Sequence, residues 1–250
     1  MKQNWKPGTM IYPLPAVLVS CGDASGLRNL LTVAWTGTVC TDPPMCYVSI
    51  RRERHSYDII RRTGEFVINL TTEELARATD WCGVRSGRDC DKFAEMGLTP
   101  GRGAVVAAPT VEEAPISIEC RVRQVLPLGS HDMFLAEVVN VQADERYLDA
   151  GGRLDFERAR PLVYSHGEYF GLGGAIGRFG WSVRKKPQAP RGERVVEPAR
   201  AAASEQGRDA APQTSGARTA RTARTAGPKP GRAAAPKRAG GRGAKSSKRR

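Results

Sequence analysis

The sequence lacks the short motifs that identify the commonest hydrolases and nucleotide-binding enzymes. None of GxSxG, HExxH and GxxxxGK[ST] occurs in its 250 residues, which leaves no serine-hydrolase elbow, zinc-peptidase helix or P-loop. The six cysteines include no CxxC pair, and their spacing fits neither a zinc site nor a small disulfide-rich secreted domain. We therefore expect buried free thiols in a reducing compartment and no metal site.

Long apolar runs are also absent. The first ten residues, MKQNWKPGTM, are polar, and the run AVLVS at 16–20 is too short for the core of a signal peptide. No run approaches the roughly 20 residues that a membrane-spanning helix needs. The sequence therefore predicts a cytoplasmic protein with no membrane partner.

Aromatic side chains are missing from the last quarter of the chain, where none follows Trp181. Residues 184–250 hold 19 of the 39 basic residues and 4 of the 26 acidic ones, while residues 1–183 hold 20 basic and 22 acidic residues. A segment of Ala, Arg, Pro, Gly and Lys can bury too little apolar surface to offset the entropy of ordering it. We therefore expect one domain at 1–186, followed by a disordered basic tail at 187–250.

The tail is open to two interpretations. Its positive charge could bind nucleic acid or an acidic partner through non-specific, salt-dependent contacts. Alternatively, it is a solubilising extension with no dedicated partner.

Strand-like segments dominate the first 183 residues, and Gly, Pro and Asp separate them. The predicted strands are residues 16–21, 31–39, 45–50, 65–70, 116–126, 133–142 and 161–164. Many strands and few short helices favour a mainly β, closed barrel over a doubly wound sheet.

Three short helices are predicted from their capping signals. Ser56 would cap a helix at 57–63 that Gly64 ends, and Asp91 would start one at 92–96 that stops at Gly97. Thr71 and Glu74 form a capping-box pattern before a helix at 75–81.

The glycine-rich stretch GLGGAIG (171–177) does not have the spacing of a dinucleotide-binding loop. Gly171 and Gly173 would require glycine at position 176, which is Ile176. Too little of the predicted domain follows for a βαβ unit, which needs about 30 residues. We reject a Rossmann fold and interpret these glycines as a flexible turn.

The stretch VSIRRERHSYDII (48–60) is the first candidate site. An apolar strand ends in three arginines and His55, directly before a predicted helix start. Free N–H groups at a helix start, the hydroxyls of Ser49 and Ser56, and an arginine fork would suit a single phosphate group. The alternative is a solvated basic turn.

Three other segments carry candidates whose commoner role is structural. NLLTVAWTG (29–37) places small residues beside Trp35, which would let a flat ring lie close to the backbone, but a lone tryptophan is usually a core residue. Lys92 in SGRDCDKF would by itself be a surface lysine. His131, just before a predicted strand, would by itself be a turn residue.

Together and in this order, these segments resemble the flavin reductase-like family of the flavoredoxin type, which has an FMN-binding split barrel. The resemblance is carried by NLLTVAWTGTVCTDPPMCYVSIRRERHSYDIIRRTGEFVINL, by SGRDCDKFAEMGLTP and by IGRFGWSVRK. It covers roughly residues 8–186 and does not include the tail. It implies a six-stranded antiparallel Greek-key barrel with flanking helices, assembled as a homodimer with one FMN per subunit.

The resemblance also implies which residues contact the flavin. The positions that correspond to contacts in relatives are Asn29, Trp35, Ser56, Lys92 and His131. Tyr164 stands where relatives carry an aromatic residue, often Phe, and its role is the least determined. The same binding segments contain four further candidates, Thr32, Ala34, Ser49 and Arg51. A lysine or histidine beside the flavin would stabilise the negative charge of its reduced form.

The implied function is an FMN-dependent oxidoreductase that takes electrons from NAD(P)H and passes them to a flavin, a protein or a small acceptor. Hydride transfer depends on orientation, so no catalytic residues are expected beyond those that bind the cofactor. The alternative is an FMN electron-transfer protein without NAD(P)H oxidation activity of its own.

Overall fold

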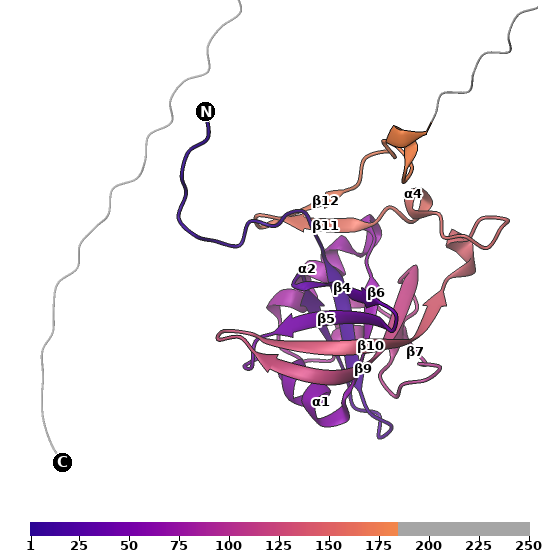
Figure 1. The fold of residues 1–250 in the computed structure, drawn as a ribbon. Helices are drawn as coiled ribbons and strands as arrows, with labels where there is room; N and C mark the ends of the chain where they lie inside the picture. Colours follow the sequence, from indigo (N-terminus) through magenta and orange to yellow (C-terminus); the bar gives the residue numbers. More distant parts are fainter. Residues whose placement is uncertain (185–250) are drawn as a thin grey trace, which may run out of the picture. The chain divides into compact units, whose positions relative to one another are not determined.

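The computed structural model describes residues 1–184, which form a mainly β structure. The predicted tail at 187–250 lies outside the described residues, so its disorder and its partners stay predictions. The largest element is an antiparallel sheet with the strand order β3-β2-β6-β9-β10-β5-β4. Figure 1 shows β5, β10 and β9 of this sheet side by side. Its strands are β2 (Val17–Gly22), β3 (Arg28–Val33), β4 (Thr36–Thr41), β5 (Pro44–Ile50), β6 (Glu65–Leu70), β9 (Ile116–Pro127) and β10 (Asp132–Ala143).

The connection between β3 and β4 closes this sheet into a barrel. The two strands are the opposite edges of the sheet, yet only Ala34 and Trp35 separate them in the chain. Three Cα–Cα steps span at most about 11 Å, so the two edges must lie close together. The N–H of Ser49 donates to the carbonyl of Trp35 at 2.9 Å and ties this break to β5.

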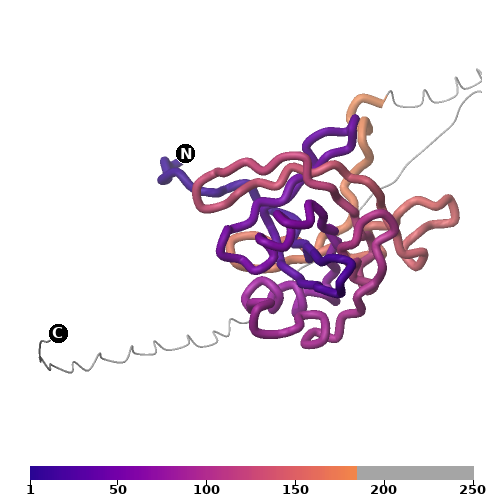
Figure 2. Tube along the Cα trace, turned by 90° about the horizontal axis from the view of Figure 1, so that it is seen from below, coloured from indigo at the N-terminus to yellow at the C-terminus, as the bar shows by residue number. Residues whose placement is uncertain are grey.

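The predicted mainly β split-barrel fold is therefore confirmed, with one difference in strand count. The stretch at 31–39 was predicted as one strand, but the chain turns at Ala34 and Trp35 and continues as β4 along β5. The sheet consequently has seven strands where six were expected. The long β9–β10 hairpin pairs with β6 through β9 and with β5 through β10. Figure 2 shows this hairpin as a long pink part of the trace.

Short helices and two small sheets complete the described residues. The helices are α1 (His55–Thr63), α2 (Ala76–Val84), α3 (Lys92–Met96) and α4 (Phe156–Ala159). The small sheets are β1 (Leu14–Pro15) with β11 (Leu162–Ser165) and β12 (Glu168–Gly171), and β7 (Pro100–Gly101) with β8 (Thr110–Val111). Single 3₁₀ turns occur at Glu73–Leu75, Glu145–Tyr147 and Trp181–Val183. Within residues 1–184, no helix has the length and apolar character needed to cross a membrane.

Two of the predicted caps are wrong. Ser56 lies inside the first turn of α1 because the helix already begins at His55, and no side chain caps it. The Thr71 hydroxyl bonds to the carbonyl of Ala16, and α2 begins only after a 3₁₀ turn. The stop at Gly64 and the cap of α3 by Asp91 are confirmed.

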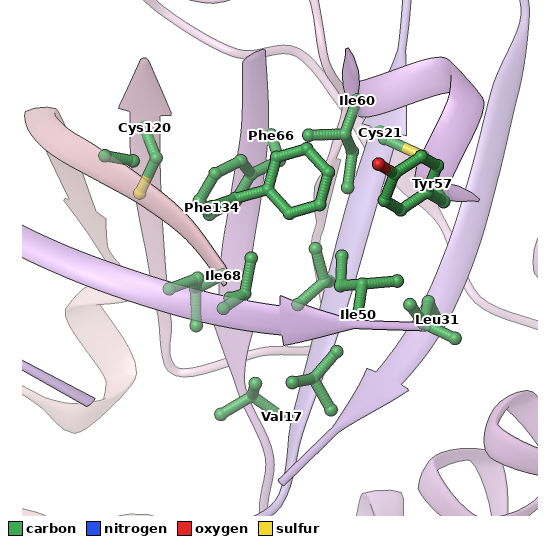
Figure 3. Packing of buried hydrophobic residues seen from close by; sticks show 14 of the residues in the cluster. Val17, Cys21, Leu31, Ile50, Tyr57, Ile60, Phe66, Ile68, Cys120 and Phe134 are labelled. Carbon is green, nitrogen blue, oxygen red and sulfur yellow. The ribbon is translucent and has the colours of Figure 1, made fainter. Parts of the chain in front are cut away.

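The core fills the barrel interior. Burial alternates along β5, so that every second side chain points inward. Figure 3 shows Phe66 of β6 and Phe134 of β10 side by side, with Tyr57 and Ile60 of α1 beside them. α1 therefore packs on the barrel core, and the residues between the inward ones, such as Ser49, face the outside of the wall.

A second cluster of buried side chains covers the outer face of β2 and β3. Leu18 and Leu30 point away from the barrel and pack against residues of α2 and α3, including Cys82 and Phe93. This packing fixes where α2 ends relative to β3, and so places the loop between α2 and α3 beside the start of α1.

Glu119 is a fully buried carboxylate in β9. It accepts hydrogen bonds of 2.7–3.0 Å from the backbone N–H groups of residues 104–106 and from the side-chain amides of Asn140 and Gln142. Burial alone would raise the pKa of Glu119, but these bonds lower it to about 2. The carboxylate therefore fixes the 104–106 loop to β9 and β10.

Replacing Glu119 by glutamine should lower the free energy of unfolding at pH 7 by about 2–4 kcal/mol. One carboxylate oxygen becomes an amide NH₂ group, which cannot accept the hydrogen bonds that this oxygen accepts, so buried N–H donors lose their partner. Urea unfolding measures this change in the free energy of unfolding.

The folded-state pKa of Glu119 lies below the ordinary value of 4.5, so its contribution to stability is present above pH 4.5 and is lost as the pH falls toward 2. Glu137→Gln, which removes an exposed ion pair with Arg123, is the control and should cost less than about 1 kcal/mol. Equal costs for the two variants would contradict this role of Glu119.

Candidate functional site

A first hollow of about 200 Å³ lies where the barrel wall is broken between β3 and β4. Its walls come from β3, the break, the end of β5 with the turn that follows, and the residue before β10. Six of the predicted cofactor-binding residues line it: Thr32, Ala34, Trp35, Ser49, Arg51 and His131.

A second hollow of about 330 Å³ lies between the start of α1 and the loop that joins α2 to α3. It is lined by three more of the predicted residues, Asn29, Ser56 and Lys92. Leu31 and Arg54 line both hollows, so the two adjoin at these side chains. The structure thus brings nine of the ten predicted residues to one region.

The tenth predicted residue, Tyr164, lies in β11 of the small sheet and lines neither hollow. Its ring centroid is 6.2 Å from that of Tyr12 and 5.7 Å from that of Tyr169. The Tyr169 hydroxyl donates to the carboxylate of Asp80 in α2 at 3.3 Å. A contact between Tyr164 and a flavin stays a prediction.

Asn29 holds the start of α1 to β3. Its side-chain Nδ2 donates to Ser56 Oγ at 2.7 Å, and both side chains are buried. A Cβ placed on Gly87 would lie 1.9 Å from Asn29 Oδ1. The loop between α2 and α3 therefore passes so close to the Asn29 side-chain amide that only glycine fits at position 87. The second hollow therefore has a tightly packed floor.

Two cations of the second hollow are anchored to the last turn of α2. Arg54 Nη1 donates to the carbonyl of Gly83 at 3.1 Å, and Lys92 Nζ donates to the carbonyl of Cys82 at 2.7 Å. The carbonyl end of a helix carries partial negative charge, so both contacts are favourable. Lys92 is only 3% exposed, and this burial lowers its pKa.

The second hollow is strongly basic. It is lined by Arg54, Arg85, Arg88 and Lys92 against one carboxylate, that of Glu53. Arg88 Nη1 donates to the backbone carbonyl of Glu53 at 3.0 Å and so ties the loop to the turn after β5. Arginine keeps its charge throughout the physiological pH range, and its planar fork suits phosphate oxygens. This hollow is therefore suited to an anion such as a phosphate monoester.

A histidine lines each hollow, His131 the first and His55 the second. Burial lowers the pKa of both imidazoles below the ordinary value of 6.5, and the neighbouring charges of Arg51 and Arg88 lower it further. Both rings are therefore neutral near pH 7, where they act as hydrogen-bonding groups. The lasting positive charge of the region comes from arginine and lysine.

The residues predicted to contact the flavin do not include several side chains of the second hollow: Arg54, His55, Arg85, Ser86 and Arg88. Arg54 and His55 belong to the basic stretch at 48–60, which the sequence indicates as a phosphate site. The other three, which stand in or beside the segment SGRDCDKF, were missed. The density of arginine in these two segments was the available signal. Their convergence depends on the packing of α2 against β3, which no local pattern reveals.

Two larger hollows are less suited to an anion. One of about 400 Å³ near α2 and α3 is lined by Glu74, Glu95 and Glu113 against a single arginine, Arg77. One of about 440 Å³ is lined by Glu112 and Asp144 against Arg146, which pairs with Asp144. Carboxylates at these positions would repel a phosphate. The two adjoining hollows at the barrel break are therefore the candidate site.

Comparison with known proteins agrees with this fold. Residues 9–173 match the model of the flavin reductase like domain. Flavoredoxin of Desulfovibrio vulgaris (Miyazaki F) superposes with a TM-score of 0.69 at 32% identity, over 74% of this chain and 100% of that one. Flavoredoxin from Methanosarcina acetivorans gives a TM-score of 0.66 at 27% identity, over the same shares of the two chains.

A curated relative of unknown function, from Aeropyrum pernix, is 32% identical over 156 residues. The match covers 62% of this chain and 58% of that protein, so this chain spans little more than half of the relative's length. The domain match extends over well more than half of this chain and includes both hollows. The chain therefore belongs to the flavin reductase-like domain family.

Proposed function

We propose that the chain binds FMN across the two hollows and functions as an oxidoreductase. One observation carries the proposal: a hollow beside an aromatic ring adjoins a basic hollow, and Arg54 lines both. The isoalloxazine ring would lie against Trp35 in the first hollow, and the phosphate would bind among Arg54, Arg88 and Lys92 in the second.

The residues of the first hollow would orient the ring and influence its potential. When bound, FMN supplies the redox chemistry, and the protein supplies position and electrostatics. His131 lines the first hollow, whereas Lys92 lies in the second. Burial lowers the pKa of His131, and its imidazole would stabilise a reduced ring by a hydrogen bond.

NAD(P)H is the proposed electron donor, and a flavin, a protein or a small oxidant is the proposed acceptor. The proposal includes a homodimer in the cytoplasm. A second candidate function is an FMN electron carrier that does not oxidise NAD(P)H itself. The sequence does not separate the two functions: no glycine-rich loop with dinucleotide spacing occurs in the chain, and the resemblance to the family implies no separate loop of that kind.

The full-length protein, purified without added flavin, should show flavin absorption, and its extracted chromophore should be FMN. Trp35→Ala should raise the FMN dissociation constant about tenfold or more, because the ring loses its aromatic neighbour. Trp5→Ala, which removes an exposed tryptophan that lines neither hollow, is the control and should bind like the wild type. A colourless protein that takes up no FMN when FMN is supplied would refute the proposal.

Gly87→Ala should weaken FMN binding while the barrel stays folded, because the new methyl group displaces Asn29 and with it Ser56. We expect a loss of about tenfold or more, measured by quenching of flavin fluorescence. Gly173→Ala is the matched control, since a Cβ there meets no atom within 4 Å. Equal affinity of the two variants would show that the Asn29–Ser56 pair does not shape the site.

Steady-state oxidation of NADH and NADPH, with and without added FMN, should distinguish the two candidate functions. Turnover with either donor is expected for the leading proposal. If neither donor is oxidised while the photoreduced protein still reduces an added acceptor, only the carrier function remains.

A further inference from the structure

We propose that Asp132 is a positioning residue that sets the affinity for the FMN phosphate without touching the ligand. It would do so by holding the turn at 51–54 and the first turn of α1 in their binding arrangement. The inference rests on the proposed function and assigns a role to a residue that lines neither hollow.

Asp132 joins three parts of the chain that build the site. Its carboxylate accepts hydrogen bonds from Arg52 Nε at 3.1 and 3.0 Å, from Arg52 Nη2 at 2.9 Å and from the Tyr57 hydroxyl at 2.6 Å. Arg52 belongs to the turn after β5, Tyr57 to α1, and Asp132 is the first residue of β10. We call these three residues the Asp132 network.

Each member of the Asp132 network is next to residues that line the hollows. Arg51 precedes Arg52 in the chain, Ser56 precedes Tyr57, and His131 precedes Asp132. A shift of any one of the three parts would therefore move a side chain of the site.

The arginines of the turn have two different roles, lining the hollows and binding Asp132. Arg51 and Arg54 line the hollows, whereas Arg52 binds Asp132 and lines neither. Arginines this close repel one another, and the paired carboxylate offsets one of the charges. Asp132 is 4% exposed, so water does little to screen the charge of its carboxylate from Arg52.

Tyr57 gives the network a rigid connection to the core. Its ring is 3% exposed and meets Phe134 edge to face, with the centroids 5.3 Å apart. Figure 3 shows this ring on α1 within the barrel cluster. The carboxylate therefore fixes the turn to a packed helix rather than to a mobile surface.

The inference can be tested because positioning and simple electrostatics predict opposite results. Asp132→Asn removes a negative charge beside an anion site, which by Coulomb attraction alone would strengthen FMN binding. If Asp132 positions the turn, the same change should weaken FMN binding about tenfold or more. Riboflavin, which lacks the phosphate, should lose much less affinity.

The experiment measures the dissociation constants of FMN and riboflavin for the full-length chain by fluorescence quenching at fixed ionic strength. Arg52→Lys keeps the positive charge but loses the two-nitrogen fork to Asp132, so Coulomb attraction alone predicts no change and positioning predicts the selective loss. The Arg52 side chain is 58% exposed, and this variant serves as the test if Asp132→Asn fails to fold. The double variant should lose no more than the worse single variant, because both remove the same interaction. The control is Asp144→Asn, which should bind FMN like the wild type. Asp144 also pairs with an arginine, Arg146, but it lies just after the opposite end of β10.

Unchanged or tighter FMN binding by Asp132→Asn and Arg52→Lys would overturn the inference and leave the proposed function intact. Equal losses for FMN and riboflavin would also overturn it, because they would indicate a general structural defect. A wild-type protein that binds neither flavin would instead refute the proposed function, and the inference with it.

Discussion

The two-residue connection between β3 and β4 is the constraint on which the site depends. Because Ala34 and Trp35 must join the two edges of one sheet, the barrel is closed by the chain itself at this point. The wall is consequently interrupted there, and Trp35 is held at the interruption by its hydrogen bond with Ser49. The first hollow is a direct result of this topology, and the second adjoins it because α1 follows β5 after a single turn.

Three basic residues of the second hollow are held in position by hydrogen bonds within the chain. Arg54, Arg88 and Lys92 each donate to a backbone carbonyl, two of them in the last turn of α2. Side chains fixed in this way lose little conformational entropy when an anion arrives, which favours affinity. The same arrangement explains why α2, whose buried face packs on β3, contributes to the site mainly through its end.

Much of the fold could be predicted from the sequence, because apolar strands punctuated by Gly, Pro and Asp are a local signal. β6 has the predicted bounds, and α3 begins and ends where its capping residues indicated. The break in the strand predicted at 31–39 was not visible, since only its pairing with β5 distinguishes β4 from a continuation of β3. Nine of the ten site residues converge, but Arg85 and Arg88 resemble solvated surface charges until the position of Gly87 against Asn29 fixes the path of their loop.

The sequence separation within the Asp132 network has a consequence for the order of events during synthesis. Asp132 lies 80 positions after Arg52 and 75 positions after Tyr57. While β10 is still inside the ribosome, the turn at 51–54 of the nascent chain lacks the carboxylate of Asp132 that stabilises it. Cofactor loading would then have to wait until the second half of the barrel has emerged from the exit tunnel.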